Sequence, residues 1–209
     1  MKKNLITYCI CAMLLAFYTS AYSAEGPYVS GNIGFAMLSD SDITDSTVPG
    51  ITLDSEFDTG LALGVALGYG FGKTRIEGEI AYQKNDFDKI GVLGVSFDAS
   101  GDATTLAFLL NGYYDFTNNS RFTPYVSAGL GFARIEVNDF SVPILGVPPE
   151  SDDDTVFAYQ IGAGVGYAVS KNVTIDVKYR YFATSDPKFD TTEAEFASHN
   201  LLFGVRVNF

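Results

Sequence analysis

The sequence predicts an all-β protein: an eight-stranded antiparallel up-and-down transmembrane β-barrel, preceded by a cleaved signal peptide. Three observations lead to this fold class. Large apolar residues alternate with small or polar ones along eight segments, the period of two that strands produce. Short and long connections join these segments in turn. Charged residues share the parity of Gly and Ala, so the large apolar side chains face away from the charges.

The first residues indicate export. Lys2 and Lys3 precede an apolar run over residues 5–17, and small residues follow in "TSAYSA". This order is typical of a secretory signal peptide, and we expect residues 1–23 to be removed, leaving a barrel domain over residues 24–209. The alternative, a retained membrane anchor, is disfavoured because the run is shorter than the ~20 residues that span a bilayer.

The positions of the cysteines and the net charge exclude two further classes of protein, those stabilised by disulfides and those that bind nucleic acid. Cys9 and Cys11 both lie in the predicted signal peptide, so the mature chain has no disulfide to stabilise it. Without Lys2 and Lys3 the formal charge of −12 becomes −14. Such an acidic chain is a poor partner for nucleic acid, whose phosphates require clustered Lys and Arg.

The segment 57–71, "FDTGLALGVALGYGF", shows the alternation most clearly. Its odd positions are large and mostly apolar, from Leu61 to Phe71, and its even positions are Gly, Ala or Asp. This pattern predicts a strand with one large apolar face and one face of very small residues. Seven other segments alternate in the same way: 29–37, 75–83, 105–116, 122–132, 157–167, 173–181 and 199–209.

The connections predict how the strands are arranged. Short turns are expected at Gly72–Lys73 and at residues 117–120 and 170–172. Long loops are expected over residues 39–56, 85–102, 138–154 and 184–197. Because short and long connections alternate, the strands form an antiparallel meander with every long loop at one end.

Either face could line the interior of such a barrel. A lipocalin-like soluble barrel would place the apolar face inside, but an eight-stranded interior is only just wide enough for side chains and the many Phe and Tyr would overfill it. The small face also carries charges, which are tolerated in a lumen where they can pair and are costly against lipid. We therefore expect lipid on the apolar face and a lumen charge network of Arg75, Glu77, Glu79, Asp176, Lys178, Arg180 and Arg206. In it Glu77 and Glu79 face Arg180, Lys178 or Arg206 and plug the lumen.

Several stretches carry a family resemblance, among them "PYVSAGLGFA", "FAYQIGAGVGYAVSKNVTIDVKYRYF" and the terminal "LLFGVRVNF". With these the chain resembles the small outer-membrane barrels of the OmpA/OmpX and opacity-protein type. The resemblance implies an integral monomer in the Gram-negative outer membrane, with long loops outside and turns in the periplasm. It also implies contact with outer-membrane lipids and lipopolysaccharide, and insertion by the barrel-assembly machinery. The C-terminal insertion signal would be Phe203, Val205, Val207 and Phe209.

Two motifs suggest chemistry and fail on inspection. "GYGFGKT", residues 68–74, looks like a phosphate loop, but Leu67 stands where the first Gly is required and a strand follows instead of a helix. His199 and Ser198 are the candidate base and nucleophile of a lipid A-modifying enzyme. They are adjacent on a strand and so point to opposite faces, and Leu201 replaces the Ser of a His-x-Ser motif. We expect no catalytic residue and no cofactor.

The predicted loops hold the remaining candidates. Residues 39–46 and 150–154 are rich in carboxylates, but the first lacks the Gly and distal Glu of a calcium loop, so we expect no metal site. Residues 144–149, "ILGVPP", form an apolar stretch that could touch a partner. The sequence thus favours a non-enzymatic barrel for envelope integrity or surface interaction, as in an adhesin or surface antigen. The alternative is a porin-like channel for small solutes, because in the resembling family lumen ion pairs can exchange partners.

Overall fold

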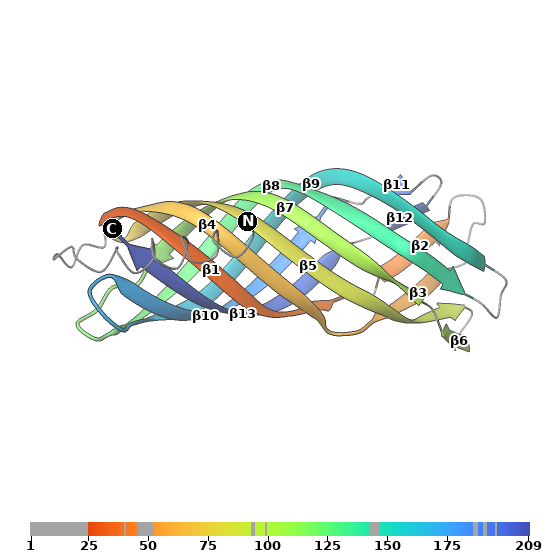
Figure 1. Ribbon diagram of the computed structural model, residues 1–209, viewed down its shortest axis with the longest axis horizontal. Coiled ribbons are helices and arrows are strands. Elements are labelled where there is room, and N and C mark those ends of the chain that lie inside the picture. The colour runs from red at the N-terminus through yellow and green to blue at the C-terminus, as the bar shows by residue number, and fades with distance from the viewer. Residues whose placement is uncertain are drawn as a thin grey trace, which may run out of the picture.

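The computed structural model describes residues 25–39, 41–45, 52–92, 95–98, 100–142, 147–185, 188–189, 192–194 and 196–209. The predicted signal peptide lies outside these residues, so it and its cleavage site stay predictions. Eight long strands build the molecule (Figure 1): β1 (Glu25–Leu38), β4 (Gly60–Phe71), β5 (Thr74–Val92), β7 (Ser100–Asp115), β8 (Phe122–Val142), β9 (Val147–Ala168), β10 (Val173–Thr184) and β13 (Ala197–Asn208).

The eight strands close on themselves. Each is antiparallel to its neighbours in the order β5-β4-β1-β13-β10-β9-β8-β7, and β5 pairs with β7 to complete the ring. The first and last strands lie side by side, with Val29 opposite Val207 and Phe35 opposite Leu201. Closure leaves these strands without a free edge, so their backbone groups are satisfied without water or disulfides. The predicted antiparallel barrel is confirmed.

Short turns gather at one end, which we call the turn end. Gly72 and Lys73 join β4 to β5, and Gly72 has φ of 78°, a value that glycine adopts without strain. Between β7 and β8, Asn118 closes the turn by donating from Nδ2 to the Phe122 carbonyl at 2.9 Å. Between β9 and β10, the backbone N–H groups of Asn172 and Val173 donate to Ser170 Oγ. The C-terminal residue Phe209 also lies here, with its N–H donating to the Pro27 carbonyl.

The opposite end, which we call the loop end, differs from the prediction. Much of each predicted long loop is strand, because β5 continues to Val92, β8 to Val142, and β9 already begins at Val147. Five short strands add to this end (Figure 1): β2 (Ser41–Asp45), β3 (Thr52–Phe57), β6 (Val95–Asp98), β11 (Lys188–Phe189) and β12 (Thr192–Ala194). The alternation did not reveal them because strands beyond the membrane need no apolar face.

The structure also corrects the boundaries of two predicted segments, the strand over residues 57–71 and the loop over residues 138–154. The segment predicted as one strand over 57–71 is divided, since Phe57 ends β3 and β4 begins at Gly60. The acidic run 150–154 belongs to β9, where Asp153 lies opposite Glu136 of β8 and Asp154 lies opposite Ile135. Residues 41–45 of the other acidic segment form β2, and residues 147–149 of the apolar stretch begin β9. Residues 144–146 of that stretch lie outside the described part.

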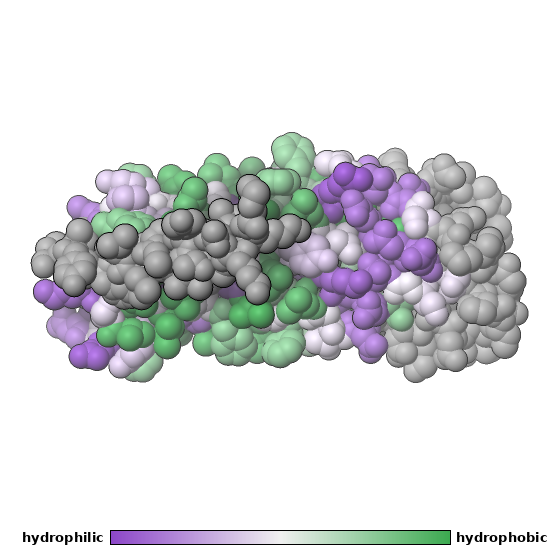
Figure 2. All heavy atoms as spheres, viewed as in Figure 1, coloured by the Kyte–Doolittle hydropathy of each residue, from purple (hydrophilic) through white to green (hydrophobic). Residues whose placement is uncertain are grey.

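The large apolar residues of the ring face outward, as the period of two predicted. Leu67 on β4, for example, exposes 70% of its surface, whereas Ala66 beside it is buried. Figure 2 shows these residues as a hydrophobic band over the half nearer the turn end, with hydrophilic residues beyond it toward the loop end. A band of exposed Phe, Tyr, Leu, Ile and Val is the surface that lipid covers in a membrane barrel. Within the described residues no helix is long and apolar enough to cross a membrane, a finding that concerns helical spans alone.

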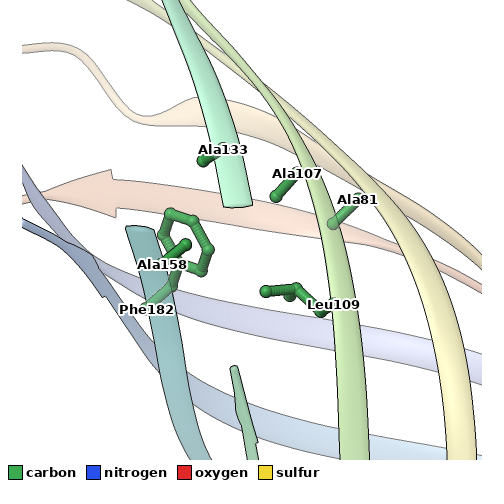
Figure 3. Close-up of a cluster of buried hydrophobic side chains, with 6 residues drawn as sticks. All are labelled: Ala81, Ala107, Leu109, Ala133, Ala158 and Phe182. Carbon is green, nitrogen blue, oxygen red and sulfur yellow. The ribbon is translucent and has the colours of Figure 1, made fainter. Parts of the chain in front are cut away.

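The interior is filled rather than open. Toward the loop end six side chains from five strands point into the barrel and pack against one another (Figure 3): Ala81, Ala107, Leu109, Ala133, Ala158 and Phe182. Phe196, just before β13, packs against this cluster. On the other side of the ring Ala36, Ala62 and Leu202 form a second cluster. The polar groups nearer the turn end therefore lie beneath an apolar layer.

Candidate functional site

The candidate site is the charged part of the lumen, and the small residues of the strands make room for it. A Cβ added to Gly68 would overlap the ring of Tyr28, which crosses from β1 over this position. At Gly164 an added Cβ would lie 2.6 Å from the Tyr125 hydroxyl. Gly68 and Gly164 thus serve packing, because each lets a large tyrosine side chain from the adjacent strand lie over it.

Arg75 and Asp115 form the ion pair nearest the turn end. Arg75 donates from Nε to Oδ2 and from Nη2 to Oδ1 of Asp115, both at 2.9 Å. The guanidinium also lies over the ring of Tyr113, 4.2 Å from its centroid, and 5.2 Å from that of Tyr125. A two-bond pair packed on aromatic rings fixes the Arg geometry in a way that a single contact does not.

Glu77 accepts hydrogen bonds from three hydroxyl groups. They come from Tyr28 at 3.0 Å, Ser30 at 3.1 Å and Tyr113 at 2.7 Å. Among the described residues Glu77 therefore makes no ion pair with an arginine or lysine of the kind that the sequence suggested. Its buried negative charge is stabilised by neutral donors from β1 and β7 together with the nearby cations.

Glu79 forms the central ion pair of the lumen. Arg180 on β10 donates from Nη1 to Glu79 Oε1 at 3.0 Å, and Asn111 donates to Oε2 at 2.7 Å. Gln160 in turn donates to Asn111 Oδ1, which extends the network to β9. Both oxygens of Glu79 are occupied, so this pair satisfies the geometry that a buried ion pair requires.

The other predicted lumen charges are placed differently. Asp176 accepts a hydrogen bond from the Tyr125 hydroxyl at 3.0 Å. Lys178 is buried, and its Nζ lies 5.9 Å from the Tyr113 ring centroid, without an ion pair to any residue that the structure describes. Arg206 lies over Tyr28, 5.6 Å from the ring centroid, and its Nε is buried without an acceptor.

Sequence reasoning missed important members of the network. Asp115 was not among the predicted lumen charges, because it stands at the end of a strand, next to the turn. Tyr28, Tyr113 and Tyr125 were not recognised as hydrogen-bond donors to carboxylates. The signal was available for Asp115 and Tyr113, since both share the parity of Asn111 on β7. With Asp115 included, the described residues of the lumen contain four cations (Arg75, Lys178, Arg180, Arg206) and four carboxylates (Glu77, Glu79, Asp115, Asp176).

Nearer the loop end the lumen contains neutral polar groups. Ser198 Oγ donates to Gln83 Oε1 at 3.1 Å and accepts from Asn200 Nδ2 at 3.1 Å. Asn85 Nδ2 donates to the Ala36 carbonyl and, through a second contact, to the Asp58 carbonyl. These side chains connect β5 and β13 to each other, to β1 and to the residue Asp58 that precedes β4.

His199 and Ser198 point to opposite faces of β13. Ser198 is fully buried in the lumen, whereas His199 faces outward and its Nδ1 lies 2.6 Å from the Tyr179 hydroxyl. The His199 ring also contacts Tyr181, with centroids 5.3 Å apart. The two side chains therefore cannot act as a nucleophile and its base.

Outward-facing charges form a rim just beyond the apolar band. Lys84 Nζ lies 3.1 Å from Asp102 Oδ1, and Arg134 contacts both Glu136 at 2.9 Å and Asp153 at 3.2 Å. Burial raises the pKa of Asp102, but hydrogen bonds from Lys84, Asn138 and Thr104 outweigh it, so the pKa lies below its usual range. The hydrogen bond to Asp102 and its negative charge raise the pKa of Lys84.

The predicted insertion signal and the acidic segments can also be placed. Phe203, Val205 and Phe209 face outward on the apolar band at and beside the C-terminus. Among the described residues no group of three or more His, Cys, Asp or Glu side chains is arranged to hold a metal ion.

The closed ring, the outward apolar band and the charge-filled interior together define a small transmembrane β-barrel. The chain belongs to the family described as "Outer membrane protein beta-barrel domain", whose model matches residues 9–209. It is accordingly an integral protein of the Gram-negative outer membrane.

Individual relatives agree with this assignment. The chain is 30% identical over 198 residues to outer membrane protein PagN of Salmonella typhimurium, covering 86% of this chain and 83% of the relative. It is 24% identical over 178 residues to a Rickettsia felis protein named "Putative adhesin", covering 78% and 75% of the two chains. Among solved structures, Neisserial surface protein A matches with a TM-score of 0.59 and 24% identity, covering 90% of this chain and 98% of that one. The structural match shows the same fold.

Proposed function

We propose that the protein is a non-enzymatic surface barrel: its packed lumen holds a rigid scaffold in the outer membrane, and its loop end engages a cationic partner outside the cell. The scaffold would also support envelope integrity. The observation that carries this proposal is the distribution of charge along the barrel.

The negative net charge of the chain comes from one end of the barrel. The four segments that connect strands at the loop end, 39–59, 84–104, 134–156 and 184–197, contain twenty Asp and Glu against four Lys and Arg. The lumen is balanced, and the turn end has Lys73, Arg121 and Lys171 against Glu25. Segregated charge of one sign creates a field that attracts oppositely charged partners and repels like-charged ones.

Charge complementarity selects the partner class. A basic protein surface or cationic peptide suits this end, whereas a sulfated polysaccharide would be repelled by it. The relative named as an adhesin supports a role in surface contact, and the acidic rim residues extend that surface down to the apolar band. Outer-membrane lipids and lipopolysaccharide would surround the apolar band of the monomeric barrel.

Adhesion of intact cells tests this proposal. Cells displaying the protein should bind polylysine-coated beads and not heparin-coated beads, with binding that falls as salt rises. The triple variant Asp86→Asn, Asp139→Asn and Asp152→Asn removes three charges at the loop end and should weaken bead binding several-fold. Glu25→Gln removes a carboxylate at the turn end and should change nothing. Equal binding by the triple variant and the parent would reject the proposal.

A channel for small solutes is the second candidate. Two cavities in the turn-end half share Arg75 and Arg206 among their lining residues, and the inner one, of about 20 Å³, reaches Glu77 and Lys178. Lys178 lines this inner cavity and has no ion-pair partner among the described residues. It could replace Arg180 as the partner of Glu79, and the released Arg180 would then disturb the apolar cluster on its loop-end side. Planar-bilayer recordings decide the matter: stepwise conductance that changes in Lys178→Met would favour a channel, and silent bilayers would favour the scaffold.

A lipid A-modifying activity is disfavoured by the opposite orientation of Ser198 and His199 and by the hydrogen bond between His199 and Tyr179. Mass spectrometry of lipid A from cells with and without the protein tests this directly. We expect identical acylation patterns.

A further inference from the structure

A cavity of about 140 Å³ lies inside the turn end of the barrel. Its lining includes Arg75, Asp115, Lys171, Arg206 and the hydroxyl residues Thr123 and Thr174. The volume is close to the ~150 Å³ of cavities that accept a benzene molecule, so a tetrahedral oxyanion with a few waters fits inside it. Unlike those cavities, this one is lined by polar and charged groups.

The charges in the cavity are not balanced. Arg75 is neutralised by its two hydrogen bonds to Asp115. Arg206 has no such partner: within the described part of the chain its guanidinium makes no ion pair or hydrogen bond, and its Nε is buried without an acceptor. Lys171, on the turn between β9 and β10, adds another positive charge at the mouth. Three cations therefore face one carboxylate.

Arg206 lines the cavity without an ion-pair partner among the described residues, and a bound anion would balance its positive charge. Arginine binds oxyanions through its planar fork of N–H donors, each bond strengthened by charge. Thr123 and Thr174 also line the cavity, and a threonine hydroxyl is a neutral hydrogen-bond donor. Excess positive charge excludes a metal cation as the occupant.

We propose that this cavity is a binding site for a small oxyanion of the phosphate class, held by Arg206 with help from Lys171 and the threonine hydroxyls. Two sources carry this chemistry on the turn side of the membrane: free inorganic phosphate and the phosphate of a lipid headgroup. The site is independent of the partner proposed for the loop end.

The test is calorimetric titration of inorganic phosphate into the refolded barrel in octyl glucoside, a detergent without phosphate, at constant ionic strength. The parent should bind one phosphate per chain, and chloride should not compete. Arg206→Gln should weaken binding by at least about tenfold, the loss typical of a charge-assisted bond. Lys73→Gln is the matched control, because it removes one cation from the same end without lining the cavity, and it should leave affinity within twofold.

Two further arms complete the test. Repeating the titration with a short-chain phosphatidylcholine present identifies the source: competition assigns the site to headgroups as well, and its absence assigns it to free phosphate. If Arg206→Gln does not refold, Thr174→Val removes one donor and should weaken binding about fivefold. No saturable phosphate binding by the parent, equal losses in Arg206→Gln and Lys73→Gln, or full affinity in Thr174→Val would overturn the proposal.

Discussion

Arg180 Nη1 lies 3.0 Å from Glu79 Oε1 although 101 residues separate them in the chain, and their side chains expose only 2% and 0% of their surface. The pair joins β10 to β5 across the lumen, so it connects opposite walls of the barrel and not neighbouring strands. Such a contact resists any change in the cross-section of the ring.

We therefore expect Arg180→Ala to destabilise the barrel by about 3–5 kcal/mol, because it leaves a buried carboxylate without its cation. Urea unfolding in detergent micelles measures the change. Arg121→Ala, on an exposed turn, is the control and should change stability by less than about 0.5 kcal/mol. Unchanged stability together with unchanged conductance in Arg180→Ala would remove the basis for a lumen network.

Replacing both partners sharpens this test. Glu79→Leu combined with Arg180→Met removes the unpaired charge along with the pair, so part of the lost stability should return. If the double variant is as unstable as the sum of the two single variants, the two residues act independently and the ion pair is not the cause.

Gly68 and Gly78 offer a matched pair of glycines on adjacent strands. A Cβ at Gly68 would overlap the Tyr28 ring, whose hydroxyl donates to Glu77, whereas a Cβ at Gly78 meets nothing within 4 Å. Gly68→Ala should therefore cost about 1–3 kcal/mol through overpacking. Gly78→Ala faces outward and should be neutral or slightly stabilising. Unfolding midpoints of the two variants, measured side by side, check the expected order.

Some of these residue positions could be predicted from the sequence, and others could not. Alternation placed Leu67 outward and Gly68 inward correctly, and the turn at Gly72 was found from its neighbours in sequence, because both are local properties of one strand or hairpin. The partner of Glu79 was left open among three cations, since contacts across the lumen depend on how the strands are staggered around the ring. A period of two carries no information on that stagger. Likewise the loop-end parts of β8 and β9 were not predicted as strands, because they lack the apolar face that alternation detects.

The outward face is predicted to tolerate charge only beyond the apolar band. Val65 is exposed near the middle of β4, so Val65→Arg should cost about 2–4 kcal/mol in a bilayer. Thr104 faces the rim, where its Oγ1 donates to Asp102. Thr104→Arg should cost no more than about 1 kcal/mol at this position. Equal costs in lipid vesicles would show that the rim also lies in hydrocarbon.

The rim pair Lys84–Asp102 predicts a modest dependence on pH. The folded-state pKa of Asp102 is lowered, so its contribution is present above the unfolded pKa of about 3.9 and is lost as pH falls through the folded value. Asp102→Asn should thus be less stable than the parent at pH 7, by much less than Arg180→Ala, because the pair is solvated. The difference between parent and variant should vanish near pH 2. A difference that persists there would assign the effect to packing.

The C-terminal residue offers a test of assembly rather than stability. Phe209 and Phe71 lie at the same end of the apolar band and expose 53% and 55% of their surface, so lipid contact should treat them alike. If Phe209 belongs to an insertion signal read by the barrel-assembly machinery, Phe209→Ala should lower the folded fraction in cells several-fold, while Phe71→Ala should not. Folded protein is counted by its faster gel mobility before boiling. Both purified variants should refold alike in detergent, where no machinery acts. Equal losses in cells would mean that both residues serve only as membrane anchors, since an interfacial aromatic at either position gives the same free energy to the barrel.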